Sequence, residues 1–346
     1  MPRWGRHRRG HEVLEAGLIH WVSDSFGRVQ EQLFETVVQP ALYAMDLGTF
    51  VEDAYDATGW LLVGLLQLLA MVALIGPLQR WRPVEWRGGA WRPVGVDVFY
   101  TLLHRLGLFR LAMFFSVDVV LDRLSGVAVV HGIEGIQLDA MVAHWWPEVL
   151  GTAWASFVLY LIVFDFLGYW IHRAQHRFQP WWALHALHHS QRQMTMWTDN
   201  RNHLLDDLLT DFLIALTARL IGVPPGQFVA VVAITQLVEN FAHANVRVGF
   251  GWLGERLLVG PRFHWQHHAM GMGHEGQRPG TLGGCNFAVL FPVWDILFGT
   301  ARFDGAYEAT GIRDQLRQEG ARDYGEGFWA QQWLGLKRLG QGASRR

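Results

Sequence analysis

The sequence is poor in cysteine and in charge. Cys285 is the only cysteine among 346 residues. This excludes intramolecular disulfides, structural zinc sites built on several cysteines and cysteine-ligated iron–sulfur clusters. Charged residues make up 17% and the formal net charge is −2; an average soluble domain has about 25% charged residues. The sequence therefore offers no basic field for nucleic acid and predicts no such partner, and any metal must be held by ligands other than cysteine.

Long apolar segments dominate the composition, with hydrophobic residues at 51%. Residues 60–78 carry no charge and approach the roughly 20 residues that a helix needs to span a bilayer. Glycine and proline at 222–226 interrupt the apolar stretch 208–245 and predict a helical hairpin. The candidate membrane segments are 60–78, 96–121, 149–171 and 208–245, with 33–51 as a weaker candidate for an extra span.

The second of these segments contains His104, Arg105, Arg110 and Asp118, which must face protein or snorkel if it spans. The predicted fold class is an all-α integral membrane protein. It has about four to five transmembrane helices and a cytoplasmic helical cap that carries a histidine-rich di-metal site.

The chain is predicted to have four parts. They are an N-terminal amphipathic segment (1–59), transmembrane helices and a loop (60–148), a catalytic domain (149–300) and a C-terminal tail (301–346). The first part begins with a basic patch at Arg3, Arg6, Arg8 and Arg9 and lacks the short apolar core of a signal peptide.

Arginines predict the orientation of the chain, because positive charge is enriched in cytoplasmic loops. The residues that follow the first span include Arg80, Arg82, Arg87 and Arg92, which places this side in the cytoplasm. Counting spans from there places the loop 122–148 outside. It places 172–207 and the region after Val246 inside.

Histidine is abundant, with 17 copies, and eight of them form three boxes. His172 and His176 have i, i+4 spacing, which puts both on one helical face. The boxes His185-x-x-His188-His189 and His264-x-x-His267-His268 repeat a second spacing, whose arc of about 100° lets three imidazoles converge on one point. A catalytic zinc site typically uses about three protein ligands, so this number of imidazoles predicts two transition-metal ions on the cytoplasmic face.

In this order around a membrane hairpin, the three boxes resemble the fatty acid hydroxylase and sterol desaturase superfamily of membrane di-iron enzymes. Residues 241–245 (Phe-Ala-His-Ala-Asn) are similar to its His-x-Asn box, and residues 286–300 resemble its closing motif. Residues 201–206 resemble a stretch Arg-x-His-Pro-x-Glu, here with Leu204 for the proline and Asp206 for the glutamate. The metal ligands that the boxes and the resemblance predict together are His172, His176, His185, His188, His189, His203, His243, His264, His267 and His268.

Three other side chains are predicted to support these ligands. Glu239 precedes His243 by four residues on the same helical face, so its carboxylate is placed to accept the second ring N–H and fix the tautomer. A polar contact between spans is the alternative role for Glu239. Asp165, two turns before His172, is predicted to act similarly, and the resemblance adds Asn245. His274, beyond the last box, is predicted to be a loop histidine.

The resemblance implies two iron ions, O2 as co-substrate and oxidation of a lipid C–H bond, with hydroxylation favoured over desaturation. The lipid would be a fatty acyl chain, a sterol or a related terpenoid. The chain has no Gly-x-Gly-x-x-Gly fingerprint and no cysteine set. An external electron donor of the ferredoxin, rubredoxin or cytochrome type is therefore expected. The predicted location is a bacterial inner membrane, with the site on the cytoplasmic face.

Two other classes of function are also compatible with the sequence. One is a zinc-dependent membrane hydrolase, although the His-Glu-x-x-His motif is absent. The other is a non-catalytic metal-binding membrane protein, whose ligands would lie within the spans and not beyond them.

Overall fold

The structure, a computed structural model, describes residues 21, 23–85, 91–133 and 135–343. The basic patch at Arg3 to Arg9 and Arg87 lie outside the described residues. Within the described residues the chain is helical and has no β-strand, only two isolated bridges. The all-α fold is therefore confirmed for this part of the chain. The residues group into two compact units, one that ends at Leu66 and one that begins at Gln67.

In the first unit, a helix from residue 23 continues through a π-helical turn (Phe34–Val38) into α2 (Gln39–Ala44). It ends before Asp46, whose φ of 57° breaks the helix. The weaker candidate span 33–51 is therefore interrupted. A 3₁₀ turn (Gly48–Phe50) then leads to α3 (Val51–Ala70).

Two helical segments in the described residues are long and apolar enough to cross a membrane, Gly48–Trp81 and Ala153–Arg177. The first combines α3, a π-helical turn (Met71–Ile75) and α4 (Gly76–Trp81), and contains the predicted span 60–78. The second is α10, which covers most of the predicted span 149–171. Thr152 caps α10 by accepting a hydrogen bond from Ala155 N at 3.2 Å.

The predicted span 96–121 is a broken helix. The helix α5 (Trp91–Arg105) stops before Gly107, whose φ of 80° suits a residue without a Cβ. The chain resumes as α6 (Leu108–Met113), a π-helical turn (Phe114–Asp118) and α7 (Val119–Val130). The break means that this segment is not one straight spanning helix.

Polar side chains of this segment face protein, as expected. His104 Nε2 lies 3.3 Å from Asp207 Oδ2, and Arg105 donates to Asn240 Oδ1 at 2.9 Å. Asp118 Oδ1 lies 3.7 Å from Arg219 Nη2. These contacts join α5–α7 to the hairpin of α12 and α13.

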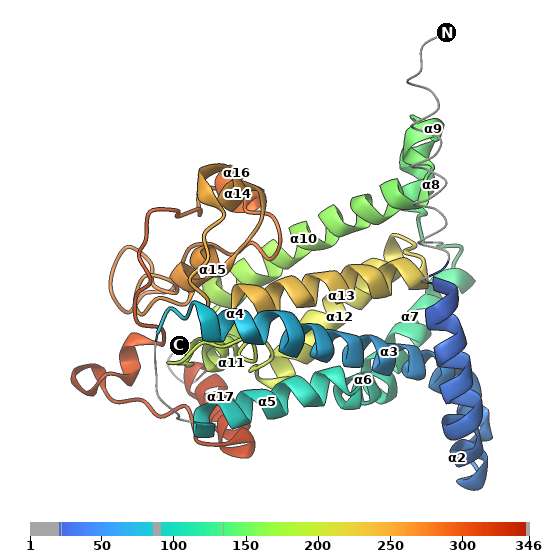
Figure 1. Cartoon of the computed structure of the whole chain (residues 1–346), viewed down its shortest axis with the longest axis horizontal. Helices are drawn as coiled ribbons and strands as arrows, with labels where there is room; N and C mark the ends of the chain where they lie inside the picture. The colour runs from blue at the N-terminus through green and yellow to red at the C-terminus, as the bar shows by residue number, and fades with distance from the viewer. Residues whose placement is uncertain (1–20, 22, 86–90, 134, 344–346) are drawn as a thin grey trace. The chain divides into compact units, whose positions relative to one another are not determined.

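The predicted hairpin at 208–245 is present as α12 (Leu204–Leu220) and α13 (Pro225–Ala242). Gly222 makes the turn with a φ of 68°. Tyr160, Phe164 and Val231 form a buried cluster between the hairpin and α10. In Figure 1, α10, α12 and α13 run alongside one another.

The remaining helices gather at the two ends of α10. Figure 1 shows α8 and α9 at its beginning, and α11, α15 and α17 at the end that carries its histidines. We call the second group, with the segments that join it, the cap. The bounds of these elements are α8 (Leu138–Ala143), α9 (Pro147–Leu150), α11 (Gln179–His189), α14 (Gly251–Leu257), α15 (Pro261–His267), α16 (Val293–Leu297), the 3₁₀ turns Arg313–Gln315 and Arg317–Glu319, and α17 (Phe328–Ala343).

Candidate metal centre

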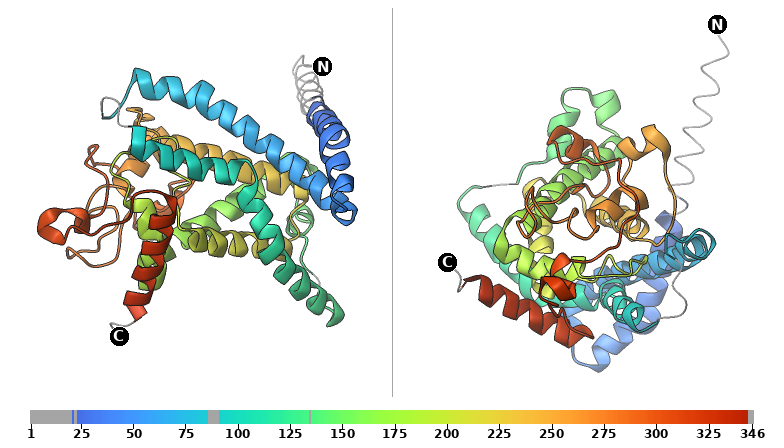
Figure 2. Two further views of the ribbon diagram at one scale, coloured as in Figure 1. Left: turned by 90° about the horizontal axis from the view of Figure 1, so that it is seen from below. Right: turned by 90° about the vertical axis from the view of Figure 1, so that its left-hand side faces the viewer.

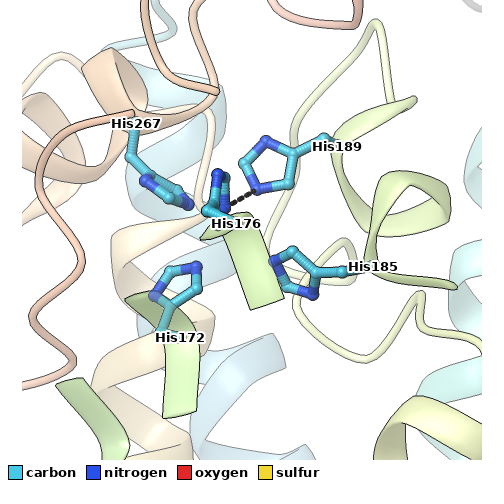
Figure 3. Close-up of side chains that lie close together, drawn as sticks. All are labelled: His172, His176, His185, His189 and His267. Carbon is cyan, nitrogen blue, oxygen red and sulfur yellow. Dashed lines mark hydrogen bonds between the residues drawn. The ribbon is translucent and has the colours of Figure 1, made fainter. Parts of the chain in front are cut away.

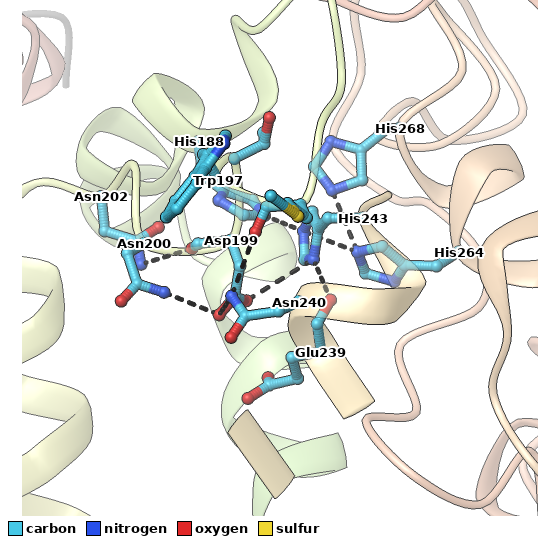
Figure 4. Close-up of polar contacts among 12 residues, drawn as sticks. His188, Trp197, Asp199, Asn200, Asn202, Glu239, Asn240, His243, His264 and His268 are labelled. Atoms are coloured by element: carbon cyan, nitrogen blue, oxygen red, sulfur yellow. Dashed lines mark hydrogen bonds and ion pairs between the residues drawn. The ribbon is translucent and has the colours of Figure 1, made fainter. Parts of the chain in front are cut away.

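Nine of the ten histidines predicted as ligands come together in two groups, and within each group the potential ligand atoms all lie within 4.8 Å of one another. Group 1, drawn in Figure 3, consists of His172, His176, His185, His189 and His267. Group 2, which Figure 4 shows with its polar neighbours, consists of His188, His243, His264 and His268. Residues far apart in the sequence thus form one compact set of nitrogen donors.

Each His-x-x-His-His box is divided between the two groups. In α11, His185 and His189 belong to group 1 and His188 to group 2, whereas at α15 His264 and His268 belong to group 2 and His267 to group 1. Residues four apart share a helical face more closely than residues three apart, so the outer pair of each box points to one group. The three imidazoles of a box therefore do not converge on one point, as the spacing had suggested, but each box contributes to both groups.

The spacing of the ring nitrogens suits metal ions. In group 2, His243 Nε2 lies 3.0 Å from His188 Nε2 and 2.9 Å from His264 Nε2, which is 3.1 Å from His268 Nε2. With metal–nitrogen bonds of about 2.1 Å, two nitrogens at right angles on one ion are about 3.0 Å apart. Nitrogen lone pairs at this distance repel one another unless a cation or a proton lies between them. Group 1 contains such a pair, His176 Nε2 and His189 Nε2, at 3.0 Å.

The two groups are direct neighbours. The rings of His189 and His268 stack with centroids 4.4 Å apart, and those of His264 and His267 are 5.1 Å apart. The ring centroids of His172 and His267, both in group 1, are separated by a similar 4.3 Å. The two groups therefore form one continuous centre of imidazole rings.

Hydrogen bonds to backbone carbonyls fix the rings of His172 and His267. Nδ1 of His172 bonds Phe287 O at 2.9 Å, and Nδ1 of His267 bonds Cys285 O at 2.8 Å. Because a carbonyl only accepts, Nδ1 carries the proton and Nε2 keeps its lone pair for a metal. The buried Nε2 of His267 has no hydrogen-bond partner within the described part of the chain. The donor set thus fits a metal that prefers imidazole.

Burial keeps these rings neutral, as a metal ligand must be. It lowers the pKa of His188, His189, His264 and His268 well below the usual value, and repulsion from neighbouring histidines lowers it further. Burial also lowers the pKa of His267, to about 3. Protons therefore compete weakly for these nitrogens at neutral pH.

A carboxylate that the sequence did not point to orients His185 in group 1. Asp206, which is buried, accepts from His185 Nδ1 at 3.0 Å, from Gln175 Nε2 at 2.7 Å and from Trp181 Nε1 at 2.7 Å. The sequence signal for this residue is its place in the stretch 201–206, where Asp206 replaces the glutamate of the family stretch. The three donors hold the carboxylate in place, so it fixes the ring of His185.

The oxygens near His243 are not those expected. Its Nδ1 donates to the backbone carbonyl of Glu239 at 2.8 Å, because the carbonyl four residues earlier lies beneath the ring at a helix end. The carboxylate that approaches it is that of Asp199, at 3.5 Å. Asp199 also accepts from Asn240 Nδ2 at 3.0 Å (Figure 4). Glu239 thus supports His243 through its backbone.

Asp165 and Asn245 act further from the ligands than predicted. The carboxylate of Asp165 accepts from Leu290 N at 2.7 Å and from the Trp294 indole at 2.7 Å. It therefore holds the segment whose Phe287 carbonyl bonds His172. Asn245 accepts from Val84 N at 3.0 Å and contacts no histidine among the hydrogen bonds of the described residues.

The structure does not bring His203 to either group. Its Nδ1 accepts from Leu205 N at 3.1 Å and caps α12, and its Nε2 donates to Gln332 O at 2.9 Å. With both nitrogens used in this way, His203 is left out of the ligand set that we propose.

His274 lies in a loop but is buried, and its ring stacks on Trp182 with centroids 5.3 Å apart.

Replacing Asp206 with asparagine is expected to weaken metal binding by about 10–100-fold, the usual effect of removing an outer partner of a ligand. Asparagine keeps one acceptor oxygen, which serves the Gln175 and Trp181 donors. Its amide N–H2 then faces His185 Nδ1 and cannot accept from it, so His185 loses its fixed orientation. Asp207→Asn is the matched control, because the neighbouring Asp207 contacts His104 and no member of either group. Competition with a chelator of known affinity measures both variants, and wild-type affinity in Asp206→Asn would contradict this role.

Residues 157–300 match the fatty acid hydroxylase family. The chain is also similar to the ornithine lipid hydroxylase of Rhizobium tropici, with 26% identity over 67% of this chain and 65% of that protein. The alkylglycerol monooxygenase of Danio rerio is 29% identical over 43% of this chain and 31% of its own length. A fatty acid hydroxylase of Lecanicillium is 27% identical over 45% of this chain and 43% of its own length.

The match thus covers less than two thirds of each of these relatives. No solved structure matches the chain. The matched region contains all nine histidines of groups 1 and 2.

Proposed function

Because this chain belongs to the fatty acid hydroxylase and sterol desaturase superfamily, we propose that it is a membrane-bound, O2-dependent di-iron oxidoreductase that hydroxylates a C–H bond of a lipid. The observation that carries the proposal is the pair of buried histidine groups inside the matched region. The names of the relatives refer to an ornithine lipid, to alkylglycerol and to fatty acid. These compounds share long alkyl chains, so we propose a substrate with such a chain over a sterol or terpenoid.

We propose that groups 1 and 2 each hold one iron ion. Iron bound there supplies the oxidation of an unactivated C–H bond by O2, in which one oxygen atom enters the lipid and the other leaves as water. The electrons come from a donor outside this chain, of the ferredoxin, rubredoxin or cytochrome type. An outside donor is needed so that the electrons balance when the second oxygen atom of O2 leaves as water.

The residues of this chain hold the nitrogens in place and keep water away. Asp206 and the carbonyls of Phe287, Cys285 and Glu239 keep the Nδ1 protons on four rings, which leaves each Nε2 free to bind metal. The burial of the rings excludes bulk solvent from the oxidising site.

We place the catalytic domain at 149–300, and the family match over 157–300 supports these bounds.

The proposed location is a bacterial inner membrane with the centre on the cytoplasmic face, supported by Arg80 and Arg82 at the end of the first long apolar helix. Single cysteines at three exposed positions test it in a Cys285→Ser background: Ser125, Gln179 and Thr281. With an impermeant thiol reagent, Ser125→Cys should label in intact cells, and Gln179→Cys and Thr281→Cys only after permeabilisation. Labelling of the last two from opposite sides would contradict a shared centre.

Lipid analysis of a host that expresses the protein tests the proposed reaction. We expect a lipid heavier by one oxygen atom in cells with the wild-type chain, absent from cells with His264→Ala. A loss of hydrogen without oxygen gain would indicate desaturation instead. An unchanged lipid profile, with the iron-loaded protein and a reducing system present, would contradict the proposal.

A further inference from the structure

One face of α17 is apolar and exposed. Trp329 is 80% exposed, Trp333 58% and Leu336 40%. Their spacing of four and three residues places all three within about 60° of arc on the helix. Exposed apolar surfaces of this kind usually mark a partner or a membrane.

Other side chains of α17 fix the helix to the protein. Arg338 donates from Nε to Ala183 O in α11 at 3.0 Å. Gln332 donates to the Tyr100 hydroxyl at 2.9 Å, and the Phe328 ring packs on Tyr100 with centroids 5.0 Å apart. The helix therefore cannot rotate to bury its tryptophans without losing these contacts.

The position of α17 matches the level at which the long apolar helices end. Those helices end at Trp81, which is 76% exposed, and at Arg177, which is followed by Phe178 with 59% exposure. Tryptophan at the end of a span is typical of the boundary between lipid and water. In Figure 1 α17 lies at this end of α10 and α13, and in the left view of Figure 2 it runs across the direction of α13 and α5.

We propose that α17 is an interfacial helix whose Trp329, Trp333 and Leu336 lie in the headgroup region of the bilayer that α10 crosses. Its orientation across the span direction places the helix axis in the plane of the membrane, as interfacial amphipathic helices lie. Lys337 Nζ lies 5.5 Å from the centre of the Trp333 ring, at the edge of the apolar face. A cation there suits the phosphate of an anionic headgroup.

The contact of α17 with the headgroup region sets the depth of the metal centre in the membrane. α17 is bonded to α11, which carries His185, His188 and His189. A helix seated in the headgroup layer thus holds these ligands at a fixed distance from the lipid that is to be oxidised. The inference goes beyond the chemistry proposed above and does not depend on it.

Spin labels test the depth of this face. Trp333→Cys and, independently, Trp329→Cys are labelled in the Cys285→Ser background and reconstituted in vesicles of phosphatidylethanolamine and phosphatidylglycerol. Gln318→Cys, at an exposed position of the cap, is the water-facing control. We expect the ratio of collision rates with O2 to those with a water-soluble nickel chelate to be several-fold higher at 329 and 333 than at 318, because O2 concentrates in lipid.

Equal ratios at all three positions would show that the face lies in water and would overturn the proposal. Dipolar coupling between identical labels at 333 that persists on dilution with lipid would identify a second copy as the occupant, which also overturns it. Neither readout uses activity or metal, so a failure here is distinct from a failure of the proposed function.

Discussion

Alanine at His176 in group 1 or at His268 in group 2 is expected to lower lipid hydroxylation by more than about 100-fold, since outer partners of a ligand alone are worth about 10–100-fold. Each substitution removes one nitrogen from one group, so metal content should fall together with turnover. Metal analysis and product formation, measured on the same preparation, check this result.

The matched control is His131→Ala. His131 is the exposed C-cap residue of α7, and its ring Nδ1 bonds Val127 O in the same helix. This variant should keep wild-type turnover and metal content. Wild-type turnover in His176→Ala or His268→Ala would show that the corresponding group does not form part of the active site.

Removing the metal is expected to abolish turnover and lower the thermal stability of the protein. Nine imidazoles, eight of them buried, remain near one another when the ions leave, and the binding free energy that favours the folded state is lost. Ferrous iron should restore both properties, whereas zinc should restore stability without turnover. Full activity with zinc after complete iron removal would contradict the di-iron proposal and favour a zinc-dependent hydrolase.

The histidine boxes were readable from the sequence because their members keep regular helical spacings. The hairpin of α12 and α13 was readable too, because glycine and proline at 222–226 interrupt an apolar stretch. Helical periodicity, however, predicted only how far apart the three histidines of each box lie around the helix. It could not show that His188 and His267 point to a different group from the other two members of their boxes. That division depends on how α11 and α15 face each other.

Long-range contacts explain the remaining differences. Asp206 reaches His185 and Asp199 approaches His243 only because of the path between α11 and α12. His203 fits a ligand motif, but its ring caps α12 and bonds α17, a helix far along the chain. The break at Gly107 was hidden because an apolar run looks the same whether its helix is continuous or not. These features depend on tertiary packing, which local patterns do not record.

The origin of the inserted oxygen distinguishes O2-dependent hydroxylation from other reactions. The purified, iron-loaded protein is supplied with lipid, a reducing system and oxygen-18 gas in ordinary water, and the product is analysed by mass spectrometry. We expect a hydroxylated lipid that carries one oxygen-18 atom, formed by the wild-type chain and not by His268→Ala. A product whose added oxygen comes from water, or equal product from His268→Ala, would contradict it.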